Sequence, residues 1–506
     1  MDVSSPQTRT RIKTVTLGWV AASFLVLSLA EPAHAVPSLA RKYQTSCITC
    51  HTVYPKLNDV GEAFRRNGYQ FPSDEDVLVK EEPVKLGVDA YKDMFPNSIW
   101  PSTLPSIPPI SIRSTMWNVV DTQPHGQQKT WDLNFPHEVG LLGAATMGKD
   151  ITGWFQLTFA PGEGADVERC FVQFSNLFAW DPDEDKDGTH LGSRWAILPP
   201  HALNLRLGKM ETSVLPHVAS EHARLTAFEP LPTTMFSLGQ TGFSLESTSP
   251  AVELHGVVKQ YWSYAIGLAN GGSASGFPVD DNTFKDVYFR VARKWFGYPL
   301  DGVVGQPEQA GKGAVQAKEP DESIYVTPGL DFWRAVGFET GVFGWWGKSN
   351  IPLTADLLPP DVVYDPNDPS TFRKEYFRRI GVDARLQYFD LDLYGVAFWG
   401  HDPFPGFLQD NITAAGPTDH LGYFIEADYT FKPWLLGFLR YEQVRIFNRG
   451  LADEEQARLV PGAVFLIRQN LKLTTELYID TRGVDTPDPD KPESTAQWIT
   501  SLDWAF

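Results

Sequence analysis

The chain has 506 residues, and its 62 acidic residues outnumber its 43 Lys and Arg, giving a formal net charge of −19. This acidity argues against nucleic acid as a partner, because a phosphate backbone attracts basic proteins. Aromatic residues make up 13%, and 41 Gly and 39 Pro supply many turns, which favours strands joined by loops. The length fits about three globular domains or one large closed barrel.

Residues 1–35 have the pattern of a secretory signal peptide. Three basic residues precede an apolar run from Val15 to Ala30, and Ala33-His34-Ala35 is a small-x-small cleavage site. A membrane anchor is the alternative, but the run between Lys13 and Glu31 is too short for the ~20 residues of a spanning helix. We therefore expect export, with a mature chain that starts at Val36.

A Cys-x-x-Cys-His motif follows at Cys47, Cys50 and His51. Two thiols at this spacing can each form a thioether with a porphyrin vinyl group, while the adjacent imidazole reaches the iron. A disulfide or a zinc site is the alternative. Zinc would need a second ligand pair, whereas the one other cysteine is Cys170 and no His pair follows at finger spacing. The motif predicts one covalent haem c.

Residues 36–80 form the predicted haem segment, followed by a linker over 81–109. Residues 55–68 have a helical pattern that starts with Pro55 and stops at Asn67-Gly68. About 35 residues cannot cover a haem and form their own core. We expect the segment to plug the lumen of the barrel that follows it.

Beyond the signal peptide, this segment resembles a known family. The residues Val36-Pro-Ser-Leu-Ala-Arg41, the haem motif, Pro55-Lys-Leu57, Gly61-Glu-Ala-Phe64 and Asn67-Gly-Tyr69 are similar to the head of the porin-fused monohaem cytochromes of the bacterial outer membrane. The best-known members of that family oxidise iron(II). The resemblance covers about 35 positions. It implies that Cys47 and Cys50 carry the haem and that His51 is the proximal ligand. The chain departs from the family at Val60, often Phe, and in its Pro-rich and acidic loops.

Further haem contacts are less specific. Four basic residues flank the motif and are candidate partners of the haem propionates: Arg41, Lys42, Arg65 and Arg66. Met94 is the nearest methionine after the motif and the candidate distal ligand, although a Met packed beside Phe95 is the alternative. Three histidines are rival distal ligands, namely His137, His217 and His222.

Residues 110–506 show strand after strand of period two. Val382, Ala384 and Leu386 alternate with Asp383 and Arg385, and the same dyad recurs near residues 287–295, 423–431 and 471–479. Charged faces on one side fit a wet lumen, and apolar faces with aromatic residues fit lipid. A soluble β-sandwich would explain any single strand as well.

The C-terminus favours the barrel. Trp498, Leu502, Trp504 and the terminal Phe506 share one alternating register, which resembles the last strand of outer-membrane proteins. Residues 110–506 accommodate about sixteen strands with their turns and loops. We predict a mainly β fold, an outer-membrane β-barrel of a Gram-negative-type bacterium with a small α-helical haem segment.

Two further features are weak signals. The loop 181–188 has acids at alternate positions like half a calcium loop, but Arg194 stands where its last ligand should be, so a solvated loop is the simpler interpretation. Cys170 fits a small apolar wall residue.

Three functions remain open from the sequence. The first is electron transfer through the haem, with extracellular iron(II) or another donor oxidised and a periplasmic c-type cytochrome reduced, an iron(II):cytochrome c oxidoreductase-type activity. The second is a porin whose haem plug gates or senses, or a conduit working outward. The third is a periplasmic β-domain with an electron-carrier module.

Overall fold

The structure is a computed structural model, and the chain divides into the units Met1–Val36 and Pro37–Phe506. All described residues lie in the second unit. They are 38–72, 78–80, 93–95, 109–121, 131–148, 150–162, 164–179, 197–215, 217, 223–234, 243–246, 248–271, 283–303, 336–352, 365, 368, 370–402, 417–448, 454–482 and 496–506. The expected signal peptide, the acidic loop 181–188, His222 and most of the linker lie outside them.

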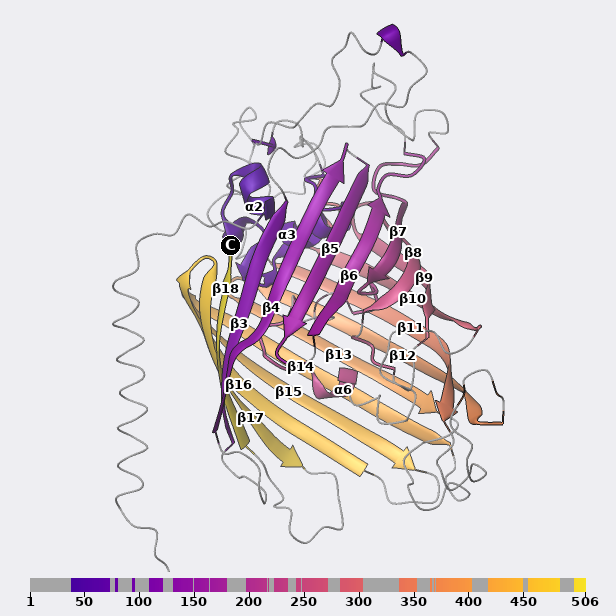
Figure 1. The fold of residues 1–506 in the computed structure, drawn as a ribbon, viewed down its shortest axis with the longest axis vertical. Coiled ribbons are helices and arrows are strands. Elements are labelled where there is room, and N and C mark those ends of the chain that lie inside the picture. Colours follow the sequence, from indigo (N-terminus) through magenta and orange to yellow (C-terminus); the bar gives the residue numbers. More distant parts are fainter. Residues whose placement is uncertain are drawn as a thin grey trace, which may run out of the picture. The chain divides into compact units, whose positions relative to one another are not determined.

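Sixteen strands and a few short elements make up the described fold (Figure 1). The short elements are α2 (Ser38–Tyr43), a 3₁₀ turn (Cys47–Thr49), β1 (His51–Val53), β2 (Lys56–Leu57), α3 (Asp59–Arg66) and α6 (Leu231–Thr234). The barrel strands are β3 (Ile110–Asp121), β4 (Trp131–Met147), β5 (Ile151–Ala160), β6 (Gly164–Phe174), β7 (Asn204–Met210), β8 (Ser249–Val258), β9 (Trp262–Asn270), β10 (Lys285–Phe296), β11 (Gly337–Pro352), β12 (Phe372–Tyr388), β13 (Leu391–Asp402), β14 (Thr418–Lys432), β15 (Leu435–Asn448), β16 (Glu454–Arg468), β17 (Leu471–Arg482) and β18 (Ala496–Ala505).

The strands close into one barrel. Each pairs antiparallel with its neighbour in the chain, and β18 pairs with β3 from Gln497 opposite Asp121 to Ala505 opposite Arg113. Closure leaves no sheet edge, so every strand backbone has partners on both sides. The predicted barrel of about sixteen strands is confirmed.

Alternation along each strand separates an apolar outer face from a charged inner face. On β12, Ile380 and Val382 are 42% and 52% exposed, whereas Arg379 and Asp383 are 0% and 3% exposed. Successive strand side chains point to opposite faces, so these two pairs occupy opposite sides of the wall. An apolar outer face on a closed barrel is suited to a lipid bilayer.

The inner face is packed rather than open. Arg290 donates to Asp383 at 2.7 Å, Arg379 to Asp402 at 2.9 Å, and Arg440 lies 3.2 Å from Glu442. Buried charges persist only when paired in this way. The charged inner face predicted a wet lumen. At these three sites the inward-facing charges form ion pairs instead of facing water.

The two ends of the barrel differ in their connections. At one end, two-residue turns join β12 to β13, β14 to β15 and β16 to β17, although the β6–β7 and β10–β11 connections at the same end span residues 175–203 and 297–336. At the other end, the loops between β7 and β8 and between β13 and β14 are long. Outer-membrane barrels have short turns on the periplasmic side and long loops outside the cell. The described N-terminal segment lies at the short-turn end, where Ser38 N donates to Ser111 Oγ at 2.7 Å.

Part of the β7–β8 loop, described at 223–234 and 243–246, folds against the inner wall. Its backbone donates to wall side chains at three points: Ala227 N to Glu476, Phe228 N to Tyr478 and Leu231 N to Glu442, at 2.8–2.9 Å. Its Leu225 packs in one apolar cluster with Val53 of the haem segment and Val460 of β16. The loop and the haem segment together occupy the lumen.

The helix of the haem segment is shorter than the sequence pattern suggests. It begins at Asp59, because Asn58 caps it by accepting from Gly61 N at 2.9 Å, and Lys56–Leu57 pair instead with His51–Val53 as a small ribbon. The helix ends at Arg66, followed by Gly68 at φ +71°. Among the described residues, no helix is long and apolar enough to cross a membrane.

Candidate functional site

The haem motif forms one tight turn. Ser46 caps the 3₁₀ turn by accepting from Ile48 N at 3.4 Å, and Cys50 N donates to Cys47 O at 3.2 Å. Cys47 and Cys50 are both free thiols. Burial raises the pKa of Cys50 to about 12, so the thiol is neutral at ordinary pH. The turn holds both thiols and His51 within five consecutive residues.

His51 is oriented by its own chain. Its Nδ1 lies 2.9 Å from Pro55 O, and a carbonyl can only accept, so Nδ1 carries the proton and the lone pair is on Nε2. Burial lowers the pKa of His51 to about 4, although backbone hydrogen bonds to Pro55 and Lys56 oppose that shift. A neutral ring with one nitrogen fixed by a carbonyl is the form that ligates a metal.

Helix α3 supports the turn from behind. Asn58 Nδ2 donates to Ile48 O and Thr49 O at 3.1 and 3.2 Å, and Asn58 N donates to Cys50 O at 3.0 Å. A Cβ at Gly61 would lie 2.0 Å from Cys50 O, so the helix can approach the motif only because position 61 is glycine. The thiols and the ring of His51 are therefore positioned by a cap residue and a glycine.

The segment is tied to the wall at its centre by Lys56. Its ammonium contacts Asp392 of β13 at 3.0 Å and also Asp428 of β14, while Arg385 of β12 donates to Leu57 O at 3.3 Å. Burial acts to lower the pKa of Lys56, but the two carboxylates hold it above its ordinary value. A charged Lys56 thus bridges two buried acids of the inner wall, one of which is also paired with Arg385.

Further contacts surround this centre. Gln469, in the β16–β17 turn, accepts from Ser46 Oγ and Cys47 N at 2.9 and 3.2 Å, beside the first thiol. On the other side, Gln173 of β6 donates to Arg66 O at 3.0 Å, and Thr152 of β5 to Gly68 O at 2.6 Å. The segment therefore contacts opposite parts of the wall and lies within the lumen.

The predicted propionate partners have protein partners of their own. Arg65 and Arg66 share Glu62, at 2.9 and 3.8 Å. Arg41 donates to Ile110 O at 2.8 Å, and Lys42 to Tyr43 Oη at 2.9 Å. Each of them thus holds the segment or its helix in place, and a role toward a propionate is an additional proposal.

The distal-ligand candidates lie in different environments. Met94 is 67% exposed. His137 on β4 stacks on Trp117 with ring centroids 3.5 Å apart. His217 lies against α3, with Nδ1 3.3 Å from Glu62 and from Arg385, and burial lowers its pKa. Among these candidates, His217 contacts the haem segment, through Glu62 of α3.

Sequence reasoning missed the residues that seat the segment. Asn58, Gln469, Asp392 and Asp428 each contact it. The capping role of Asn58 could have been predicted from the local sequence, because an Asn three residues before Gly61 and four before Glu62 suits a helix cap. The other three lie hundreds of residues away in sequence, and no local pattern links them to the motif.

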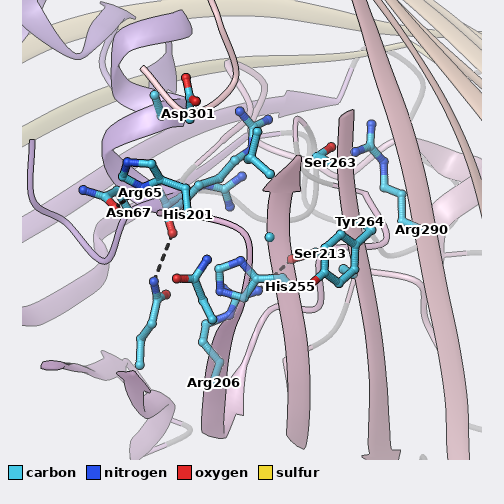
Figure 2. A pocket seen from close by; sticks show the side chains of 17 residues that line it. Arg65, Asn67, His201, Arg206, Ser213, His255, Ser263, Tyr264, Arg290 and Asp301 are labelled. Carbon is cyan, nitrogen blue, oxygen red and sulfur yellow. Dashed lines mark hydrogen bonds between the residues drawn. The ribbon is translucent and has the colours of Figure 1, made fainter. Parts of the chain in front are cut away.

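A polar pocket lies between the last turn of α3 and strands β7–β10 (Figure 2). Arg65, Arg66, Arg206 and Arg290 line it together with His201, His255, Ser263, Tyr264 and Asp301. Among the described atoms, His255 Nε2, Ser263 Oγ and Arg206 Nε have no hydrogen-bond partner. The pocket can hold water or a small polar group, and neither cysteine of the haem motif lines it.

The donor set at residues 47–51 fits a c-type haem. Two free thiols three positions apart precede a histidine whose Nε2 keeps its lone pair. In the described part of the chain, no group of three or more His, Cys, Asp or Glu is arranged to hold a metal ion directly. Cys170 faces outward from β6 as an exposed free thiol.

Closed strand order, an apolar outer face and a filled lumen define the class of this protein: a sixteen-stranded β-barrel of the porin-like outer-membrane type with an internal segment. Several solved structures of outer-membrane proteins are similar to it. An anion-selective porin from Comamonas acidovorans matches with a TM-score of 0.48 and 10% identity over 78% of this chain and 98% of its own. OmpT, an outer membrane protein of Vibrio cholerae, matches at 0.46 and 10% over 78% and 97%. The outer membrane channel DcaP of Acinetobacter baumannii matches at 0.44 and 9% over 78% and 96%.

No protein-family model and no curated protein sequence matches the chain. Its class therefore rests on its own strand order and on the two faces of its wall.

Proposed function

We propose that this protein carries one haem c on Cys47 and Cys50, with His51 as proximal ligand, and moves electrons across the outer membrane. The observation that carries the proposal is the His51 ring, whose Nδ1 is fixed on Pro55 O and whose Nε2 is left for iron, inside the short-turn end of a closed barrel. Extracellular iron(II) is the proposed donor, and a periplasmic c-type cytochrome the proposed acceptor.

The chain's own residues would fix the position of the haem. A haem bound there would add a one-electron couple whose potential depends on its axial ligands and burial. Asn58 and Gly61 fix the turn, and Lys56 fixes the segment to β13 and β14. Ile48, between the two thiols, is 53% exposed, so the motif reaches the surface at the proposed periplasmic end. Electrons can leave there without the carrier entering the barrel.

The inner side of the segment meets the filled lumen. Val53 packs with Leu225, and Lys56 contacts Asp392. This packing disfavours the alternative of an open diffusion porin, because paired charges and apolar side chains occupy the lumen at the level of Val53 and Lys56. Insoluble iron oxides would form outside the cell while only the electron passes inward.

The test uses the purified full-length protein. Cys47→Ala and Cys50→Ala should each weaken covalent haem staining in denaturing gels, and His51→Ala should change the absorption spectrum. In stopped-flow mixing, iron(II) should reduce the haem of the wild type. In proteoliposomes with an enclosed acceptor, external iron(II) should also reduce that acceptor.

Three outcomes separate the alternatives. Unchanged haem staining and spectra in all three variants would overturn the haem assignment. Haem that stays oxidised under excess iron(II) but accepts electrons from another donor would overturn the iron(II) assignment and leave a general conduit. Electron flow only from the enclosed side outward would reverse its direction.

A further inference from the structure

The polar pocket between α3 and the wall is a hollow formed around two alanines (Figure 2). Ala265 of β9 lines it, and its strand partners are His255 of β8 on one side and Arg290 of β10 on the other. Ala63 of α3 lines it from the haem segment. Because both alanines end at Cβ, the longer polar side chains around them enclose a cavity of about 50 Å³.

Three wall side chains that line the pocket have buried polar atoms without a partner. These atoms are His255 Nε2, Ser263 Oγ and Arg206 Nε, counted over the described residues, and His255 and Ser263 are 7% and 8% exposed. Register places the three together, because His255 is diagonal to Arg206 across β7–β8 and to Ser263 across β8–β9. All three groups can donate a hydrogen bond. Since buried polar groups are normally paired, this set points to a ligand that accepts.

Arg66 brings a cation to the pocket from the haem segment. Its acid partner among the described residues is Glu62, at 3.8 Å, and Arg65 holds the same carboxylate more closely, at 2.9 Å. One carboxylate therefore serves two guanidinium groups. Arg206 and Arg290, the arginines of the wall, are paired with wall acids. Arg66 is thus the cation of the pocket whose charge is least compensated.

Asp301 is the one acid among the described residues that line the pocket. Its carboxylate accepts from Val303 N at 3.0 Å and forms no ion pair with a described cation, Arg66 included. An oxyanion that carries a proton can donate to this carboxylate while its other oxygens accept from the donors. A fully deprotonated oxyanion would meet only repulsion there. The pocket therefore suits hydrogen phosphate better than sulfate.

We infer that this pocket binds inorganic phosphate, held by Arg66 of the haem segment and by His255, Ser263 and Arg206 of the wall. At about 10–15 Å³ for each water, a cavity of about 50 Å³ holds roughly three to five waters, which is room for one tetrahedral oxyanion. The ion contacts α3 and the wall at once, so it links the haem segment to β7–β9. This inference does not depend on the haem or on the donor of electrons.

The experiment measures uptake of radiolabelled phosphate by the full-length protein, purified in a neutral detergent and dialysed to equilibrium. Arg66→Gln removes the cation, and Ser263→Ala removes one donor of the wall with little change in volume. Arg293→Gln is the matched control, because this arginine of β10 lies over Trp262 and Trp295 on the outer face, at 5.1 and 4.1 Å. Heat-modifiable gel mobility checks that each variant is folded, and Ser263→Ala carries the comparison if Arg66→Gln fails to fold.

The wild type should bind one phosphate per chain, and sulfate should displace it only at a much higher concentration. Arg66→Gln should bind phosphate about tenfold or more weakly, because a hydrogen bond between charged groups is lost, and Arg293→Gln should bind like the wild type. Added phosphate should also slow hydrogen exchange at residues 63–67 of the wild type, since the ion ties the end of α3 to the wall.

Two results would overturn the inference directly: equal phosphate binding by the wild type and the folded Arg66→Gln, or tighter binding of sulfate than of phosphate. A haem propionate is a second source of an oxygen anion. Phosphate that binds the double variant Cys47→Ala, Cys50→Ala but not the wild type would mean that a propionate fills the pocket, and would overturn the inference of a free ion. Phosphate binding by both proteins supports the inference, whatever haem staining shows.

Discussion

His51 illustrates how much of a cofactor site can be contained in a few residues. Its Nδ1 is satisfied by the carbonyl of Pro55, four positions on, so the orientation of the ring needs no help from the barrel. The spacing of Cys47, Cys50 and His51 was therefore readable from the sequence. Lys56 is different, because its partners Asp392 and Asp428 lie more than 330 residues away, and an isolated Lys in a short segment gives no sign of burial.

At the residue scale, His201 predicts a pH dependence. It lies in the β6–β7 connection, where its Nδ1 is 2.9 Å from Asn67 of the haem segment, and burial lowers its pKa to about 4. The folded ring is therefore neutral, whereas an exposed His takes up a proton near pH 6.5. Its contribution to stability is present above pH 6.5 and is lost as the pH falls from 6.5 toward 4, by about 3 kcal/mol in total.

Hydrogen exchange around residues 65–70 and 200–204 measures this effect. Exchange should accelerate between pH 6.5 and 4 in the wild type after correction for the intrinsic rate. His201→Gln, which keeps an amide near Asn67 but does not titrate, should show a flatter profile. The same profile in both proteins would mean that His201 does not control this contact.

At the element scale, α3 and the small ribbon β1–β2 depend on the wall for their position. Lys56 follows β1 by three residues and is 7% exposed, between two strands that belong to the barrel. The sequence pattern predicted a longer helix from Pro55, because a proline before a periodic apolar stretch resembles a helix start. The ribbon replaced its first turn, since Lys56 and Leu57 find backbone partners in His51 and Val53.

Lys56→Met should loosen the seating of the haem segment. The change leaves the buried Asp428 without Lys56, while Asp392 keeps its bidentate pair with Arg385, and breaking a buried ion pair in this way costs about 3–5 kcal/mol. Limited proteolysis should cut residues 38–72 of the variant faster than those of the wild type, with the barrel intact.

The double variant Lys56→Met, Asp428→Asn is the control for this prediction. It removes one of the two acids along with the lysine, so it should recover part of the protection. If the double variant is cut even faster than Lys56→Met, Asp428 stabilises the segment by a route other than Lys56.

At the scale of the whole molecule, the barrel and its contents form one packed body over the described residues. The wall was predictable, because alternation such as Val382 and Ala384 against Asp383 and Arg385 is imposed by lipid on one side of each strand. The segments that fill the lumen were not predictable from the sequence. Leu231 donates to Glu442 across 211 positions, and the 223–246 part of the loop has no alternation or helix pattern that indicates entry into the lumen.

The filled lumen predicts a low ion conductance. In planar bilayers, the wild-type protein should give no steps comparable to those of an open sixteen-stranded porin, because the haem segment and the β7–β8 loop both occupy the lumen. A variant lacking residues 36–72 should conduct more, since it removes one of the two. Large, stable steps from the wild type with haem bound would instead favour the gated-porin alternative.

Strand β3 contacts both α2 and the C-terminal residue Phe506. Ile112 exchanges both backbone hydrogen bonds with the terminal Phe506, at 2.7 and 2.9 Å, while its neighbours Ser111 and Ile110 accept from Ser38 and Arg41. Three adjacent residues, Ile110, Ser111 and Ile112, thus close the barrel and hold the haem segment against it. A fault in closing the barrel between β18 and β3 would therefore also loosen α2, because Phe506, Ser38 and Arg41 all bond to three consecutive residues of β3.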